Sequence, residues 1–150
     1  MKNPKIELAK IQRRFELSVS PDNPNVTVVY MYGYVTDARY WEEDEVIATR
    51  EVREQLKAIT TPEIELHINS FGGYAFDGIV IHNLLKQHAS KVTAFVDGVA
   101  ASAASVILMA ADKIIMPANT MLMIHCAHTF AWGNAAALRK EAEDLGIAHQ

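Results

Sequence analysis

Three features are scarce in this sequence of 150 residues, and each scarcity excludes a class of protein. A single cysteine, Cys126, cannot form an internal disulfide, which fits a reducing cytoplasm. The 14 basic residues are outnumbered by 18 acidic ones and are scattered, so the basic surface of nucleic-acid or membrane binders is missing. The longest apolar run, about residues 92 to 111, is interrupted by Asp97, Gly98 and two serines, which predicts a buried strand and helix and no membrane span. No secretory signal is visible at the N-terminus.

Half of the residues are hydrophobic, which is enough for one sizeable core in a chain of this length. Residues 1–16 are mildly basic, with Pro4 near the start, and they predict a mobile arm. Residues 17–150 are expected to form one domain, because no linker or low-complexity segment divides them.

Apolar periodicity within residues 17–150 alternates between strand and helix. We expect a loop at 18–25, strands at 26–35, 64–69, 92–96, 113–116 and 121–127, and helices at 48–59, about 76–84, 101–111 and from 135 onward. The second helix is expected to bury Phe76, Ile79, Val80 and Leu84 on one face. This alternation predicts an α/β domain with largely parallel strands.

Two turns carry residues suited to chemistry. Ser102 falls where a strand passes into a helix, so unpaired backbone N–H groups would surround its hydroxyl. Taken alone, it could equally be a helix N-cap. The Gly72-Gly73 pair follows another strand and could turn its N–H groups outward as an anion nest, although a plain strand–helix turn also explains it.

His125 lies 23 residues beyond Ser102 (125 − 102) and is the natural candidate for a base, with a buried core histidine as the alternative. On a strand over 121–127, alternate side chains share a face. Cys126 would therefore point away from His125 as a buried thiol, and His128 would also point away from it.

Metal and cofactor signatures do not occur. The six histidines show no His-x-x-x-His spacing on a helix and no cysteine cluster accompanies them, so no metal site is predicted. Gly72-Gly73 lacks the third glycine of a dinucleotide-binding fingerprint, and no phosphate loop is present, so no cofactor is predicted.

Three segments in this order and spacing resemble the Clp protease proteolytic subunit family: Ile68-Asn-Ser-Phe-Gly-Gly73, Gly98-Val-Ala-Ala-Ser-Ala-Ala104 and Met123-Ile-His125. The resemblance covers about residues 26–150. The segment from His125 to Gly133, followed by a charged helix, is most similar to the phage and prophage members, the head-maturation or prohead-type proteases.

The resemblance implies roles for particular residues. Ser102 would be the nucleophile and His125 the general base, while the N–H groups of Ala103 and of Gly72 or Gly73 would form the oxyanion hole. A strand from about Cys126 to Trp132, including Ala127 and His128, would pair with an extended polypeptide substrate.

The family likeness also implies a crotonase-like α/β fold of stacked strand–strand–helix units. Subunits would stack into homo-oligomeric rings with an internal chamber, in the cytoplasm of a bacterium or a phage-infected bacterium. An unfoldase ATPase or phage capsid proteins would be candidate partners.

Two positions depart from the family pattern. Phe71 replaces the proline usual between the serine and the glycines of the loop. The triad aspartate is expected well beyond the histidine, after the ring-stacking helix, and this sequence ends within that helix, so the C-terminal part of the fold is expected to be missing. None of Asp97, Asp112 and Asp144 fits the pattern, and no aspartate is assigned.

The main prediction is therefore a serine endopeptidase that acts on unfolded or capsid-related polypeptide. The alternative is a non-catalytic ring subunit that keeps the fold without a working triad. A crotonase-type acyl-CoA enzyme would share the fold but would not need Ser102 and His125. A serine–lysine peptidase would use Lys91 or Lys113 as its base.

Overall fold

The computed structural model describes residues 15–37 and 46–148. Within them the strands are β1 Phe15–Val19, β2 Val26–Val35, β3 Val46–Ile47, β4 Glu63–Gly73, β5 Lys91–Ala101, β6 Lys113–Ile115 and β7 Met121–Met123. The helices are α1 Thr49–Ala58, α2 Ala75–Lys86, α3 Ala103–Leu108 and α4 Ala135–Ala148. Strands and helices therefore alternate as the sequence predicts.

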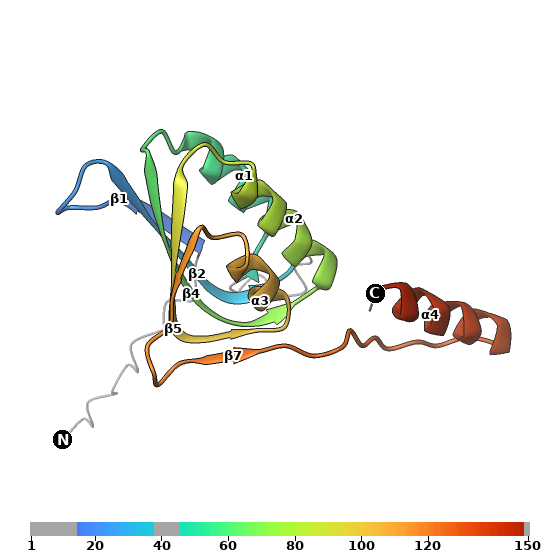
Figure 1. Cartoon of the computed structure of the whole chain (residues 1–150). Coiled ribbons are helices and arrows are strands. Elements are labelled where there is room, and N and C mark those ends of the chain that lie inside the picture. The colour runs from blue at the N-terminus through green and yellow to red at the C-terminus, as the bar shows by residue number, and fades with distance from the viewer. Residues whose placement is uncertain (1–14, 38–45, 149–150) are drawn as a thin grey trace, which may run out of the picture.

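The strands form one sheet in the order β1-β2-β4-β5-β6, with β3 paired to β2 and β7 paired to β5. Every pairing is parallel except that of β1 with β2, which is antiparallel. Helices α1, α2 and α3 lie together on one face of this sheet (Figure 1). The prediction of a largely parallel α/β fold is confirmed.

The hydrophobic core lies between the sheet and these helices. On β4, alternate residues Ile64, Leu66 and Ile68 are buried against the helices, because successive side chains of a strand point to opposite faces. The residues between them, such as Glu65 and His67, lie on the outer face and are partly exposed. β4 and β5 thus sit at the centre of the fold, and their carboxyl ends carry the candidate site.

The first strand corrects the predicted N-terminal boundaries. Residues 1–14 of the predicted arm lie outside the described residues, but Phe15–Val19 forms β1, with Phe15 opposite Met31. The arm was predicted to reach residue 16 and a loop to begin at 18, so both assignments were wrong there. Phe15 and Leu17 pack against the core from an edge strand, and this short alternation is visible only once β2 is beside it.

The predicted face of α2 is also wrong in part. The helix buries Gly78, Ile81 and Leu85, whereas Phe76 and Ile79 keep 76% and 44% of their surface exposed. Apolar residues surround most of this helix, so periodicity alone does not choose a face. Packing chooses it: a Cβ on Gly78 would lie 3.0 Å from the Cβ of Ala103, so the glycine side is where α3 comes close.

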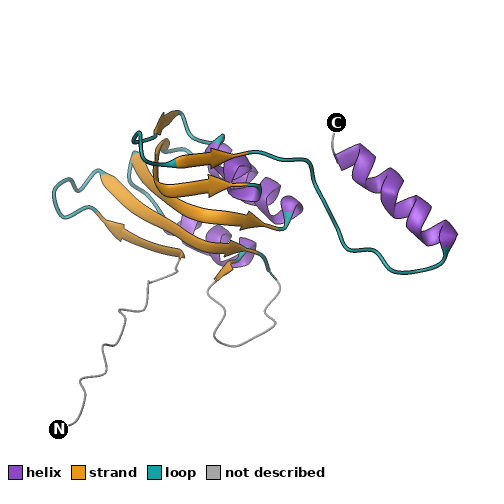
Figure 2. Cartoon of the chain, turned by 90° about the horizontal axis from the view of Figure 1, so that it is seen from below, coloured by secondary structure: helices purple, strands orange, loops and turns teal. Residues whose placement is uncertain are grey.

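The C-terminal third leaves the sheet earlier than predicted. β7 ends at Met123, and residues 124–134 have no regular secondary structure and are exposed. α4 then begins after Asn134, whose side-chain Oδ1 accepts the N–H groups of Ala136 and Ala137 as an N-cap. Figure 2 shows α4 standing apart from the sheet and the other helices. No helix among the described residues is long and apolar enough to cross a membrane.

Candidate active site

Ser102 sits in a sharp turn between β5 and α3. Its φ of 53° and ψ of −125° make it the only non-glycine residue with positive φ in the described part of the chain. Such a conformation costs about 1–3 kcal/mol and persists only where the surrounding structure enforces it. A strained strand-to-helix turn of this kind exposes a serine hydroxyl at the end of a sheet.

The hydroxyl of Ser102 meets the imidazole of His125, with 2.8 Å between Oγ and Nε2. The helix N-cap alternative is wrong, because the Ser102 side chain makes no capping hydrogen bond. β7 brings the histidine into place: Met123 pairs with Ala101, and the Met123 carbonyl accepts the Ser102 N–H at 2.8 Å. His125 follows two residues later and is exposed, so the buried-histidine alternative is wrong as well.

The other ring nitrogen of His125 fixes its tautomer. Nδ1 lies 2.6 Å from the backbone carbonyl oxygen of Cys126. A carbonyl oxygen can only accept, so Nδ1 carries the proton and Nε2 presents a lone pair to the Ser102 hydroxyl. That is the tautomer that a general base needs. A backbone carbonyl in this role has no signature in the sequence, and sequence reasoning missed it.

The three aspartates considered from the sequence all have other partners. Asp97 accepts from His67, Asp112 accepts a backbone N–H of β5 at 2.8 Å, and Asp144 pairs with a lysine on α4. Within the described residues, the recorded partners of the His125 ring nitrogens are thus one hydroxyl and one carbonyl. None of these three aspartates therefore contacts His125.

Gly72 packs directly against the nucleophile. A Cβ built on it would lie 2.5 Å from the Ala101 oxygen, 2.7 Å from the Ser102 Cβ and 2.8 Å from the Ala103 nitrogen. Its φ of 92° also favours glycine. The predicted glycine loop and the predicted nucleophile turn are therefore brought together, with the Ala103 N–H between them.

The two glycines of the loop are not equivalent as donors. The Gly72 N–H already donates to the Ser70 hydroxyl at 3.0 Å, and that hydroxyl donates to the Gly33 carbonyl at 2.6 Å. The Tyr74 N–H donates to Val35 on β2, and N–H groups of an extended segment alternate in direction. The Gly73 N–H therefore faces β5, the side on which the nucleophile turn lies.

Two predictions beyond His125 fail because the strand ends at Met123. Cys126 was expected to be a buried thiol and is exposed. His128 was expected to point away from His125, yet the two rings lie 5.2 Å apart, centroid to centroid. Strand alternation cannot be applied to a segment without strand geometry. The predicted contacts of Cys126, Ala127 and His128 with substrate stay predictions.

The lysines considered as alternative bases lie at the wrong end of β5. Lys91 begins that strand, and Lys113 pairs with Thr93 near its start. Nine residues of extended strand separate Thr93 from Ser102, about 30 Å. A serine–lysine pair is therefore not formed. No group of three or more histidine, cysteine, aspartate or glutamate side chains in the described ranges could hold a metal ion.

Comparison with known proteins agrees with this geometry. The family model described as Clp protease matches residues 42–149. The chain is 33% identical over 86 residues to the ATP-dependent Clp protease proteolytic subunit of Deinococcus radiodurans, a match that covers 55% of this chain and 42% of that relative. The chain thus spans less than half the length of this curated relative.

A solved structure, that of a ClpP1 mutant from Listeria monocytogenes, superposes with a TM-score of 0.63 at 27% identity. The match covers 81% of this chain and 65% of the other. The fold is therefore the Clp protease fold, and with nearly three quarters of the sequence matched by the family model, the chain belongs to the Clp protease family.

Proposed function

We propose that the protein is a serine endopeptidase with Ser102 as nucleophile and His125 as general base. The observation that carries this proposal is the 2.8 Å contact between Ser102 Oγ and His125 Nε2, in the tautomer that can accept the hydroxyl proton.

The reaction follows from these atoms. Ser102 Oγ attacks the carbonyl carbon of a peptide bond while its proton passes to His125 Nε2. The imidazolium then gives this proton to the leaving amine as the C–N bond breaks, which leaves an acyl ester on Ser102. Water then attacks the ester with His125 again as base, which releases the carboxylic acid product and regenerates the Ser102 hydroxyl.

The N–H groups of Ala103 and Gly73 are the proposed oxyanion hole. The approach of Gly72 to Ser102 supports this, because it places the loop beside the first N–H of α3. The alternation of the β4 ladder favours Gly73 over Gly72, whose N–H is engaged by Ser70. One such donor contributes about 3–4 kcal/mol to transition-state stabilisation.

Turnover should be low with the partners seen at Nδ1. The Cys126 carbonyl orients the imidazole, but a neutral oxygen stabilises the imidazolium less than a carboxylate does. Replacing the triad aspartate by a neutral group costs roughly 10⁴ in turnover in a well-studied serine protease, although there the wrong tautomer is also imposed. Because the tautomer here is correct, we expect a smaller loss.

The proposed substrate is an extended polypeptide that lies along residues 126–132. These residues are exposed beside the Ser102–His125 pair, and Cys126, Ala127 and His128 are the first to follow the base. Addition of the substrate as a strand would use backbone hydrogen bonds that tolerate many sequences.

We further propose assembly into homo-oligomeric rings that enclose a chamber. Phe130 and Trp132 are each 100% exposed, and residues of this type are normally covered by another surface. An unfoldase ATPase would then deliver substrate in the bacterial cytoplasm. The likeness of residues 125–133 to prohead-type members supports a role in phage head maturation, with capsid proteins as substrate.

One observation favours a second candidate, a non-catalytic ring subunit. Among the described residues, the ring nitrogens of His125 contact a carbonyl and a hydroxyl and no carboxylate, which favours a structural subunit without peptidase activity. An acyl-CoA enzyme of the same fold is disfavoured because it has no use for the Ser102–His125 contact.

A fluorophosphonate probe tests the proposal, because it reacts only with an activated serine. We expect an adduct on Ser102 in the wild-type protein, none in Ser102→Ala, and a labelling rate at least about a hundredfold lower in His125→Ala. Ser18→Ala and His82→Ala, on β1 and α2, are the matched controls and should label normally. A folded wild-type protein without adduct would rule out the peptidase proposal and leave the non-catalytic subunit as the better candidate.

A further inference from the structure

Both strand pairings that flank β4 change register at the same height. Against β2 the register shifts between Tyr32 and Tyr34, and against β5 it shifts between Ile68 and Ser70. On the β5 side the offset grows from 28 (Ile68 with Val96) to 30 (Ser70 with Ala100), so β5 carries two extra residues there. Such a bulge leaves ladder groups without their usual backbone partners.

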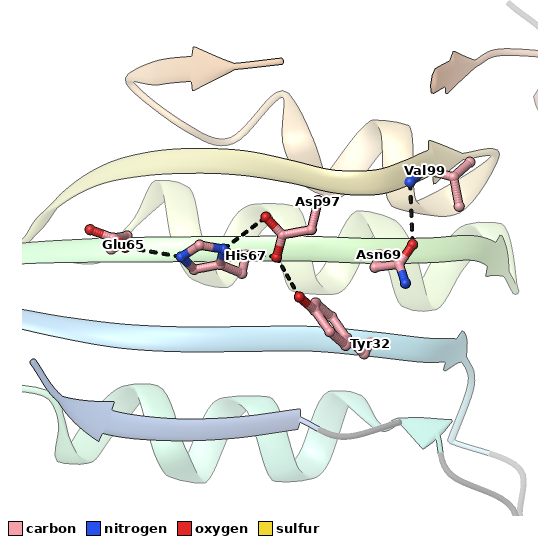
Figure 3. Close-up of polar contacts among 6 residues, drawn as sticks. All are labelled: Tyr32, Glu65, His67, Asn69, Asp97 and Val99. Atoms are coloured by element: carbon pink, nitrogen blue, oxygen red, sulfur yellow. Dashed lines mark hydrogen bonds and ion pairs between the residues drawn. The ribbon is translucent and has the colours of Figure 1, made fainter. Parts of the chain in front are cut away.

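The side chain of Asn69 spans this bulge. Its Oδ1 accepts the backbone N–H of Val99 at 3.2 Å, in place of a backbone carbonyl (Figure 3). The contact requires a glycine next to it, because a Cβ on Gly98 would lie 2.7 Å from the same Oδ1. Figure 3 shows the amide of Asn69 pointing toward Val99 across the two strands.

The bulged segment leads directly to the nucleophile. Val99, Ala100 and Ala101 pair with the three residues of β7, and His125 follows two residues after the end of that strand. Ser102 comes directly after Ala101, in its strained turn. A shift of the Val99 backbone would therefore move the hydroxyl and the strand that brings its base.

We propose that Asn69 is a positioning residue for Ser102: it fixes the bulge of β5 so that the hydroxyl meets His125 and the Ala103 N–H meets the glycine loop. It touches neither the nucleophile nor the base in the contacts recorded, and it acts through the Val99 N–H. The expected effect on the reactivity of Ser102 rests on the proposed peptidase function, whereas the role of Asn69 in fixing the β5 bulge does not.

Two variants of similar shape separate the acceptor from the packing. Asn69→Asp keeps an oxygen that can accept the Val99 N–H, at a site that is only partly buried. Asn69→Leu keeps the branched shape and loses the acceptor. Thr93→Val, a loss of a polar group on the same outer face at the far end of β5, is the matched control.

Two measurements are made on each folded protein: amide hydrogen exchange in residues 97–104, and the rate of fluorophosphonate labelling at Ser102. Asn69→Leu should exchange about tenfold faster and label about tenfold more slowly, since leaving the Val99 N–H of this part-buried hydrogen bond without an acceptor costs about one decade. Asn69→Asp and Thr93→Val should stay within about threefold of wild type.

The inference is overturned if Asn69→Leu exchanges and labels as wild type does. It is also overturned if exchange rises while labelling is unchanged, or if Asn69→Asp behaves like Asn69→Leu. Should the wild-type protein not label at all, the proposed function fails, and the exchange rates alone then decide whether Asn69 fixes the bulge.

Discussion

At the scale of single residues, the site depends on backbone atoms, which no residue type in the sequence identifies. The Cys126 carbonyl orients His125, and the Ala103 N–H stands beside the Gly72 backbone. The side chains of Ser102 and His125 were singled out from sequence because the order and spacing of three motifs resemble the Clp protease family; taken singly, each residue left a structural alternative open. The backbone groups around them depend on the geometry of the turn, so they could not be predicted from the sequence.

Gly72→Ala tests how tightly the loop and the nucleophile are packed. The added Cβ would lie 2.7 Å from the Ser102 Cβ, and φ of 92° is unfavourable for alanine, so either the loop or the turn must move. A displacement of about 1 Å can lower a rate about a hundredfold. We expect Ser102 labelling to fall by that factor and the free energy of unfolding to fall by about 1–3 kcal/mol.

Gly146→Ala is the matched control, since a Cβ at Gly146 has nothing within 4 Å. In the α4 helix this change should leave labelling unchanged and should favour the helix by up to about 1 kcal/mol. Normal labelling of Gly72→Ala would mean that the loop does not pack on the nucleophile in solution.

At the scale of elements, a polar cluster joins three strands on the outer face of the sheet. His67 on β4 lies between the rings of Tyr30 on β2 and Phe95 on β5, at centroid distances of 4.9 and 5.1 Å. Its Nδ1 is 2.8 Å from Asp97 and its Nε2 is 2.9 Å from Glu65 (Figure 3). Both nitrogens face carboxylates, which only accept, so the ring is held as an imidazolium.

This cluster predicts a pH-dependent stability. Burial lowers the pKa of His67, but hydrogen bonds to Glu65 and Asp97 outweigh burial and raise the pKa above 6.5. The folded state then binds a proton more tightly than the unfolded state, so the stabilisation is complete below pH 6.5 and is lost as pH rises through the folded pKa. The pKa of Tyr32 is raised by burial and then by Asp97, so this phenol titrates above that window.

Urea denaturation at pH 6 and pH 9 measures the effect. We expect the free energy of unfolding of wild type to decline between these values more than that of His67→Gln, which cannot bind the proton. His82→Gln, a histidine of α2, should keep the wild-type decline. Equal declines for wild type and His67→Gln would show that His67 is not held charged.

Elements that depend on local periodicity could be predicted from the sequence, whereas elements that depend on contacts with distant segments could not. The helix α1 and the start of the strand β4 follow from periodicity and were predicted closely, because each buries one regular face. The end of β4 was wrong: the strand was predicted to stop at residue 69 before a glycine turn, and it continues through Gly73. The face of α2 and the strand β1 depend on which neighbour they meet, and both were predicted wrongly. The end of β7 at Met123 likewise depends on how far β5 extends beside it.

At the scale of the whole molecule, the C-terminal third is unlike the rest. Residues 121–140 are almost entirely exposed, and α4 stands away from the body of the protein (Figure 2). Phe130 and Trp132 contribute large apolar surface to this segment. Burial of one such side chain is worth about 1.5–3 kcal/mol, so the exposed segment should favour association between copies of the chain.

Replacing Phe130 and Trp132 together by serine should therefore weaken self-association. Sedimentation velocity across a range of concentrations should show wild type in assemblies and the double variant shifted toward the monomer by at least about tenfold in dissociation constant. Val19→Ser, which removes a half-exposed apolar side chain from β1, is the control and should assemble as wild type does. An unchanged assembly in the double variant would place the interface elsewhere.

The sequence by itself was enough to predict the family, the alternation of elements and Ser102 and His125 as candidates, whose side chains the structure brings into contact. Those depend on residue type, on local periodicity and on the order of short motifs, all of which are properties of a linear chain. Only the tertiary structure decided which glycine N–H faces the nucleophile, which group orients the histidine and how Asn69 spans the bulge. The first and the third join segments about 30 residues apart, and the second is a contact of His125 with the carbonyl of the next residue. All three involve backbone atoms, which are the same in every residue, so only the fold sets the direction in which they point.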